Sequence, residues 1–185
     1  MHPHVLRRDR AALVLVDYQV KLHPHVARAD RVAANALKLA AAARVLGLPV
    51  VLTEHAVDAF GPTIEPLREA LGRCEPLHKI VFSCFGSGEF CARIEALGRP
   101  QILLAGEETH ICVSQTAHEA IARGYAVHVA GDACGARSEE DHAAGLEKMA
   151  AAGAIPGSTE IAIFELLERA GTDEFRSLLP VIKQR

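Results

Sequence analysis

The sequence predicts an α/β protein built on a parallel sheet with helices on both faces. Short apolar runs alternate along the chain with longer segments of helical periodicity, which is the pattern of repeated β-α units. The first apolar run, AALVLV at residues 11–16, is continuous rather than alternating, as is typical of a strand buried on both faces. With 185 residues the chain has the length of one domain, and we expect residues 1–185 to form it.

Each further strand is predicted where a short apolar run stops at a polar residue or at glycine. The second run leads into Thr53, the fourth stops at Gly106 and the fifth stops at Gly131. We expect right-handed crossovers between neighbouring parallel strands. The predicted strands are, in order, 11–16, 50–52, 79–82, 101–105, 126–130 and a short sixth near 154–155.

The helices between these strands are predicted from apolar spacing and from capping residues. Asp30 is the expected N-cap of the first helix, and Gly47 ends it. Ser87 is the expected N-cap of the third helix, and Ser138 with Asp141 has the spacing of a capping box. The predicted helices are, in order, 30–46, 63–71, 87–97, 113–123, 138–152, 158–169 and 172–178.

Composition narrows the class of partner. Half of the residues are hydrophobic and 23% are charged, which excludes a disordered chain. Lys and Arg number 20 against 23 Asp and Glu, so a net charge of −3 disfavours nucleic acid and anionic membranes. No uncharged apolar stretch reaches the length of a membrane span, and the N-terminal ten residues lack the apolar run of a signal peptide. We expect a cytoplasmic protein with reduced thiols that acts on a small molecule.

Three chemically active residues lie at predicted strand ends, where ligands bind in sheets of this kind. Asp17 follows the first strand, Lys79 lies on the third, and Cys112 falls where the loop after the fourth strand turns into a helix. Helix N–H groups at such a turn favour a thiolate by roughly 0.3–2 kcal/mol, and an Asp within reach can take the thiol proton. Taken singly, the three residues also have plainer interpretations: a turn residue, a solvated charge and a packed thiol.

Four segments carry a family resemblance. They are ALVLVDYQ at 12–19, HKIVFSCF at 78–85, GEETHICV at 106–113 and GYAVHVAGDA at 124–133. In this order and spacing they are similar to segments of the isochorismatase-like cysteine hydrolases, and the resemblance extends over about residues 11–167. It implies a three-layer α/β/α sandwich around a mostly parallel, Rossmann-like sheet of six strands.

The resemblance also implies a catalytic triad. Asp17 would be the base, Lys79 its cationic partner and Cys112 the nucleophile. A non-proline cis peptide is implied between Glu107 and Glu108. It would aim the N–H of Glu108, together with that of Cys112, at a developing oxyanion.

Four more residues are candidates for substrate binding. Tyr18 and Phe85 are candidate apolar walls of the pocket, with a core role as the alternative for each. Gln19 belongs to the first motif. His110 lies two residues before the candidate nucleophile and either contacts substrate or bonds to the backbone.

The histidines of the strand-end loops do not form a recognisable metal motif. His23 and His25 lack a matched third ligand and are expected on a solvated loop. Glu54 and His55 do not have the spacing with which nicotinamidases hold a metal. We therefore expect no metal, no other cofactor and no nicotinamide substrate.

The sequence thus predicts a hydrolase that cleaves a small-molecule amide or related C–N or acyl bond through a thioester on Cys112. Two alternatives stay open: vinyl ether hydrolysis by acid catalysis, as in family members that cleave isochorismate, and a weakly catalytic binding or assembly protein. An activated Cys112 is expected to react with alkylating reagents with an apparent pKa well below about 8.5. The high apolar fraction predicts a homo-oligomer, a dimer or larger, and the resemblance implies the same because members of the family commonly assemble.

Overall fold

A computed structural model describes residues 4–184 of the chain. Its fold is built on a six-stranded parallel sheet. Residues 1–3 and 185 of the predicted domain lie outside the described residues. All strand pairs are parallel, and the strand order is β3-β2-β1-β4-β5-β6, so the predicted α/β class is confirmed. The strands are β1 (Ala11–Val16), β2 (Val50–His55), β3 (Leu77–Lys79), β4 (Gln101–Gly106), β5 (Ala126–Ala130) and β6 (Ile155–Gly157).

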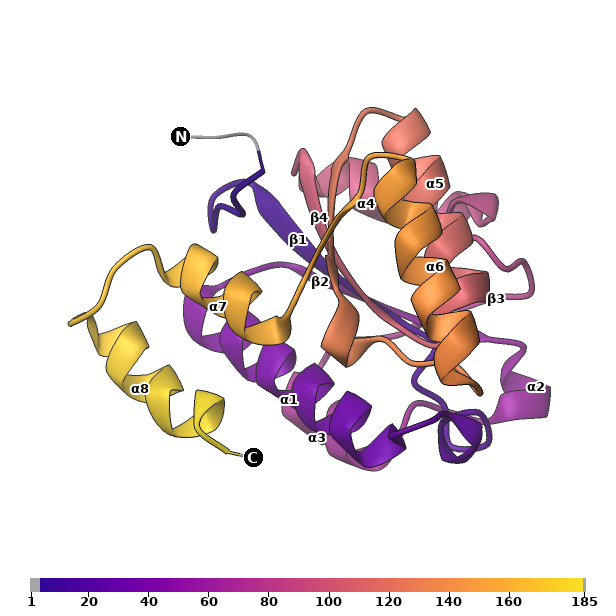
Figure 1. The fold of residues 1–185 in the computed structure, drawn as a ribbon, viewed down its shortest axis with the longest axis horizontal. Coiled ribbons are helices and arrows are strands. Elements are labelled where there is room, and N and C mark those ends of the chain that lie inside the picture. Colours follow the sequence, from indigo (N-terminus) through magenta and orange to yellow (C-terminus); the bar gives the residue numbers. More distant parts are fainter. Residues whose placement is uncertain (1–3, 185) are drawn as a thin grey trace.

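Helices cover both faces of the sheet and complete the predicted three-layer sandwich (Figure 1). One layer contains α1 (Ala29–Leu46), α3 (Glu65–Leu71), α7 (Thr159–Leu167) and α8 (Asp173–Ile182). The other contains α4 (Gly88–Leu97), α5 (Ser114–Ala122) and α6 (Glu139–Ala151). A short helix that was not predicted, α2 (Val57–Phe60), follows β2. No helix within residues 4–184 combines the length and the apolar character needed to cross a bilayer.

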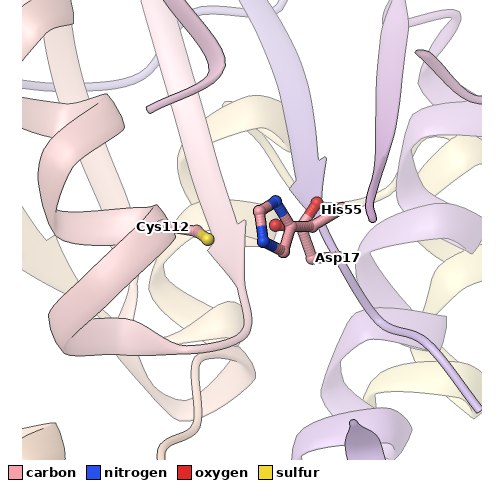
Figure 2. A group of neighbouring side chains, drawn as sticks. All are labelled: Asp17, His55 and Cys112. Atoms are coloured by element: carbon pink, nitrogen blue, oxygen red, sulfur yellow. The ribbon is translucent and has the colours of Figure 1, made fainter. Parts of the chain in front are cut away.

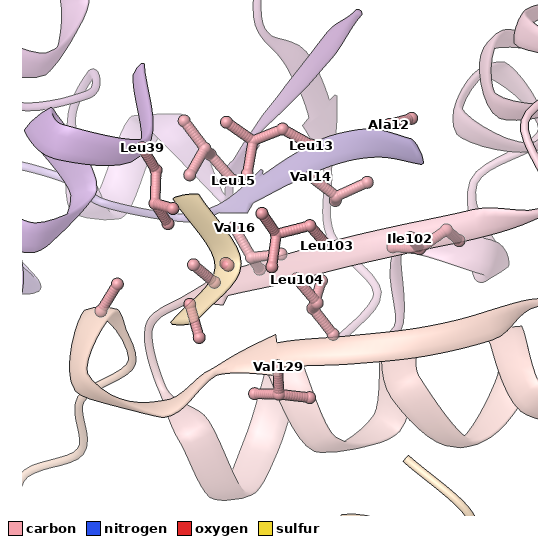
Figure 3. Packing of buried hydrophobic residues seen from close by; sticks show 14 of the residues in the cluster. Ala12, Leu13, Val14, Leu15, Val16, Leu39, Ile102, Leu103, Leu104 and Val129 are labelled. Atoms are coloured by element: carbon pink, nitrogen blue, oxygen red, sulfur yellow. The ribbon is translucent and has the colours of Figure 1, made fainter. Parts of the chain in front are cut away.

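The core centres on β1, which pairs with β2 on one side and β4 on the other. All six residues of β1 are buried, as its continuous apolar run predicts. Figure 3 shows its side chains packed with those of β4, with Leu39 of α1 and Val129 of β5 close by. Small residues on the buried face of α1, Ala36, Ala40 and Ala43, let this helix approach the sheet closely.

The third strand covers Leu77–Lys79, so it begins two residues before the predicted strand 79–82 and ends where that prediction begins. The apolar run at residues 80–82 leaves the sheet, and Ile80 and Phe82 are 85% and 52% exposed. The reason is the Lys79 ammonium, which donates to the carbonyl oxygens of Val81 at 3.3 Å and Phe82 at 3.2 Å. These two bonds turn the chain around the lysine nitrogen, so the run cannot continue the ladder with β2.

The candidate site lies at the carboxyl ends of the central strands. Val16 of β1 is in register with Thr53 of β2 and with Gly106 of β4. His55 at the end of β2 is in register with Lys79 of β3. Residues that directly follow β1, β2 and β4 therefore meet at one edge of the sheet.

Candidate active site

The centre of the site is an ion pair between Asp17 and Lys79. Asp17 is fully buried and turns the chain out of β1 with a φ of 58°, a conformation that aspartate tolerates better than most residues. Its Oδ2 lies 2.5 Å from the Lys79 Nζ. Its Oδ1 accepts a hydrogen bond of 2.7 Å from the Thr53 hydroxyl. Both carboxylate oxygens are therefore held by donors.

Lys79 is buried because partners surround its ammonium. The Lys79 side chain is 1% exposed. Burial by itself would lower the pKa of Lys79, but Asp17, with the thiols of Cys84 and Cys112, more than offsets burial, and the net pKa is raised. The lysine is charged at neutral pH and supplies a fixed positive charge next to the carboxylate.

Cys112 lies on a π-helical turn (Thr109–Val113) that runs directly into α5. Its side chain points toward Asp17 and His55 (Figure 2), and the residue is 5% exposed. Burial, followed by the carboxylate of Asp17, raises the pKa of Cys112 to about 12, against the opposing effect of Lys79. The structure thus corrects the expectation of an activated thiolate, because the desolvation of the sulfur outweighs the nearby ammonium. Cys112 is a thiol at neutral pH with a carboxylate at hand to accept its proton.

His55 joins Asp17 and Cys112. One nitrogen of His55, the Cys112 Sγ and one oxygen of Asp17 all lie within 4.8 Å of one another (Figure 2). Gln19 clamps the backbone of His55, with its Oε1 accepting from the His55 N–H at 2.7 Å and its Nε2 donating to the His55 carbonyl at 2.9 Å. The imidazole lies against two aromatic rings, with centroid distances of 5.9 Å to Phe60 and 5.5 Å to Phe82.

The loop after β4 contains a cis peptide bond between Glu107 and Glu108. The Glu107 N–H donates to Val16 at 2.9 Å and the Thr109 N–H donates to Gly135 at 2.8 Å. Between them, the N–H of Glu108 has no backbone acceptor among the described residues. The Glu108 carboxylate accepts from the Arg137 Nε at 2.8 Å and does not enter the site chemistry.

Glu107 is fully buried, with its Oε1 2.6 Å from the His23 Nδ1. Burial raises the pKa of Glu107, and the hydrogen bond from His23 opposes that rise only in part. The same hydrogen bond raises the pKa of His23. The prediction that His23 lies on a solvated loop is therefore wrong, because it is anchored to the buried carboxylate, whereas His25 is exposed.

The other predicted contact residues have partners of their own in the structure. Tyr18 is fully buried and its hydroxyl donates to the Ala133 carbonyl at 2.5 Å, so it is a core residue and not a pocket wall. Phe85 packs edge-on against Phe90 of α4, with ring centroids 5.0 Å apart. His110 points toward α6, with its Nε2 4.0 Å from the Asp141 carboxylate. Gln19, described above, contacts the His55 backbone and is fully buried.

Two residues at the site were not identified from the sequence as part of it: Thr53 and His55. They lie two residues apart on β2 and therefore point to the same face of the sheet. The signal was present, because β2 ends beside β1 and alternate polar residues at a strand end face the same ligand site. The spacing of Glu54 and His55 argues against a metal motif, but it leaves open whether His55 contacts a substrate and does not test a role in proton transfer.

Asp17, His55 and Cys112 are residue types that bind zinc, and within residues 4–184 they are the group of three potential ligands close enough to do so. The ammonium of Lys79, however, already lies 2.5 Å from Asp17. It occupies one side of the carboxylate and repels a second cation. The arrangement suits proton transfer better than metal binding.

A surface hollow of about 590 Å³ lies near the site. Phe60, which packs on the His55 ring, and Glu108 are part of its lining. The other lining residues are Lys21, Leu22, His25, Ala59 and Arg137. Asp17, His55, Lys79 and Cys112 are not part of its lining.

Comparisons with known proteins match this chain to one family. Residues 11–161 match the model of the Isochorismatase domain. Isochorismatase domain-containing protein 2A of Mus musculus is 33% identical over 179 residues, which are 95% of this chain and 84% of that protein. The structure of the MAR1 ribonuclease from Caenorhabditis elegans superposes with a TM-score of 0.91 at 27% identity, over 97% of this chain and 93% of that one.

Two YcaC structures are also similar, each at 27% identity. YcaC from Pseudomonas aeruginosa, which carries hexane-2,5-diol and covalent acrylamide, has a TM-score of 0.90 over 96% of this chain and 91% of its own. YcaC from Escherichia coli, described as an octameric hydrolase of unknown specificity, has a TM-score of 0.88 over 95% and 91%.

Proposed function

Because the chain belongs to the isochorismatase family, and membership of that family suggests a hydrolase, we propose that it is a cysteine hydrolase that cleaves a small amide or a related acyl bond. One observation carries the proposal. The Cys112 sulfur lies within 4.8 Å of an Asp17 carboxylate oxygen, and that carboxylate is paired with the buried ammonium of Lys79. A nucleophile, a proton acceptor and a fixed positive charge thus share one enclosed site.

In the proposed mechanism, proton transfer accompanies nucleophilic attack. The raised pKa of Cys112 means that the thiol does not ionise beforehand. The sulfur attacks the carbonyl carbon while its proton moves to Asp17. When the C–N bond breaks, Asp17 returns that proton to the leaving nitrogen, and a thioester remains on Cys112. Water then attacks the thioester, releases the acid and restores the thiol.

Charge on the substrate oxygen would be stabilised by the loop of the cis peptide. The N–H of Glu108 has no backbone acceptor among the described residues and is available to a ligand. We propose that it acts with the N–H of Cys112 as the oxyanion hole. Loss of one such donor typically lowers the rate on the order of 10²–10³-fold.

A small substrate fits this site better than a polymer. Asp17 and Lys79 are buried and Cys112 is 5% exposed, so a bulky chain has no direct access to them. The net charge of −3 also disfavours a polyphosphate backbone. The ribonuclease name of the Caenorhabditis elegans structure describes that protein and does not change this proposal.

Vinyl ether hydrolysis is the second candidate. Asp17 alone, protonated by solvent, would supply the proton for that reaction, and Cys112 would be a bystander. The buried thiol beside the carboxylate favours acyl transfer, since a packed thiol needs no base. A weakly catalytic binding protein would need neither group.

We also propose a homo-oligomer in the cytoplasm. Ile80, Val81 and Phe82 form an exposed apolar patch beside the site, at 85%, 38% and 52% exposure. The similar YcaC of Escherichia coli is octameric. The five cysteines are free, which suits a reducing compartment. Light scattering of the wild type and of Ile80→Glu tests the assembly, and a monomeric wild type contradicts it.

Covalent labelling tests the proposed nucleophile. The protein is incubated with a panel of small amides and acyl esters, and intact-mass spectrometry records any adduct. We expect an acyl adduct located on Cys112 that is absent from Cys112→Ala. Cys91→Ala, which removes a half-buried thiol outside the site, is the matched control and should keep the adduct. Turnover that survives in Cys112→Ala contradicts the covalent mechanism and favours catalysis by Asp17 alone.

A further inference from the structure

The candidate site contains a titratable side chain that the proposed function leaves without a role. The imidazole of His55 lies within 4.8 Å of both the Cys112 sulfur and the Asp17 carboxylate (Figure 2). Its position is built rather than incidental, because Gln19 holds the His55 backbone on both sides and the Phe60 and Phe82 rings pack against the imidazole. A residue held this firmly beside a nucleophile calls for a chemical explanation.

The imidazole is in the state that a base requires. The charged or titratable groups that face it are Asp17 after β1, Lys79 of β3 and Cys112 of the π-helical turn. Burial lowers the pKa of His55, Lys79 lowers it further, and Asp17 opposes both only in part. The ring is therefore neutral at neutral pH and has a free nitrogen lone pair.

One ring nitrogen of His55 lacks a partner. The Nδ1 is buried and has no hydrogen bond within residues 4–184. Such a group costs about 1–3 kcal/mol when it stays unsatisfied, and exceptions of this kind are found at catalytic sites or where water binds. An imidazole nitrogen and the sulfur lie within 4.8 Å of each other and no hydrogen bond joins them, so we place the water of the second step beside this imidazole.

Asp17 is less free than His55 to activate that water. One of its oxygens accepts from Lys79 and the other from Thr53, so both carboxylate oxygens already have donors. In the first half of the reaction the thiol proton reaches Asp17 through direct proximity. In the second half the attacking water also needs a base, and the neutral imidazole, within 4.8 Å of the sulfur, can supply one.

We propose that His55 is a second catalytic base, which deprotonates the water that hydrolyses the thioester on Cys112. This role rests on the proposed function. As the water oxygen bonds to the acyl carbon, one water proton moves to the imidazole. The C–S bond then breaks, the proton passes from the imidazolium to the departing sulfur, and the carboxylic acid leaves. The cycle ends with the thiol and the neutral imidazole restored.

The test separates the two halves of the reaction with p-nitrophenyl acetate. Its leaving group needs no proton, so the burst of p-nitrophenolate reports acylation of Cys112 and the later steady state reports deacylation. We expect His55→Gln to keep the burst and to lose on the order of 10²-fold or more in steady-state rate, the lower end of a general-base contribution. The retained burst shows that the variant is folded. Intact-mass spectrometry should show the acetyl adduct accumulating in His55→Gln.

Two readouts distinguish a base from a merely structural residue. The wild-type deacylation rate should rise with pH through an inflection below the ordinary histidine value of about 6.5, and His55→Gln should lose that inflection. His78→Gln is the matched control, because His78 is exposed, next to Lys79 on β3 and directed to the opposite face. It should deacylate as the wild type does.

The outcomes are distinct. A wild-type burst with unchanged deacylation in His55→Gln overturns the role of His55 and leaves the proposed function intact. An inflection that survives in His55→Gln also overturns it. A wild type that forms no adduct, or an adduct that persists in Cys112→Ala, overturns both proposals.

Discussion

Replacing Lys79 with methionine should destabilise the protein by an amount set by Asp17. The change removes an ammonium 2.5 Å from a fully buried carboxylate. At an effective dielectric constant of 20, this distance corresponds to an attraction of about 7 kcal/mol. The protein need not lose all of this energy, because the unpaired Asp17 carboxylate can take up a proton. For an ordinary aspartate with a pKa of about 3.9, protonation at pH 7 costs about 4 kcal/mol, and this cost limits the loss.

Because the cost of protonating the aspartate sets the upper limit of the loss, the destabilisation depends on pH. At pH 5 the cost of protonating an aspartate falls to about 1.5 kcal/mol. We therefore expect Lys79→Met to lose about 4 kcal/mol of unfolding free energy at pH 7 and about 1.5 kcal/mol at pH 5, each relative to the wild type at the same pH. Urea denaturation followed by circular dichroism at the two pH values measures both.

Two variants serve as controls. The double variant Asp17→Asn with Lys79→Met removes both charges and should recover most of the stability, because an unpaired buried charge is the source of the loss. Lys148→Met removes an exposed lysine on α6 and should change the free energy by less than about 0.5 kcal/mol. A loss in Lys79→Met below about 1 kcal/mol at pH 7, or one that does not depend on pH, would refute the reasoning.

Three further predictions concern the thiol, a buried pair and a glycine. With a pKa of about 12, Cys112 should be alkylated by iodoacetamide at a rate that rises through pH 10, and a plateau near pH 8 would contradict burial as the dominant effect. The pKa values of His23 and Glu107 are raised in the folded state, so the stability that this pair contributes is present at low pH and is lost as the pH rises. The variant His23→Gln should therefore show a smaller decline of the unfolding free energy above about pH 6.5, as measured by urea denaturation. Gly106→Ala would place its Cβ 2.4 Å from a backbone oxygen of β1 and should cost about 3 kcal/mol or more, whereas Gly98→Ala meets no atom and should cost about 1 kcal/mol in the same assay.

The strand pattern was predictable because burial on both faces leaves a continuous apolar run. Residues 11–16 show such a run, and β1 lies at the centre of the sheet with every residue buried. Capping residues predicted two helix starts correctly, since Ser87 accepts from the Phe90 N–H at the beginning of α4 and Ser138 from the Asp141 N–H at the beginning of α6. The predicted cap Asp30 is wrong, because it lies inside the first turn of α1, whose N-cap is Arg28 without a side-chain hydrogen bond. These signals depend on neighbours within a few residues and survive without knowledge of the tertiary fold.

The end of the third strand was not predictable in this way. The run at residues 80–82 has the composition of a strand, yet its exposure is high because Lys79 bonds to the carbonyls of Val81 and Phe82. The lysine takes that position only because Asp17, 62 residues earlier, holds its ammonium. A local apolar pattern cannot report a contact over such a separation.

The sequence by itself determined the class of fold, the central strand and the positions at which Asp17, Lys79 and Cys112 could meet. Only the tertiary structure decided that Tyr18 is core, that Gln19 holds a backbone rather than a ligand, and that His55 faces the sulfur. It also decided the protonation state of Cys112, because burial, which no spacing of residues reveals, outweighs the charges beside it. The direction of a side chain and its distance from water depend on the packing of several strands at once.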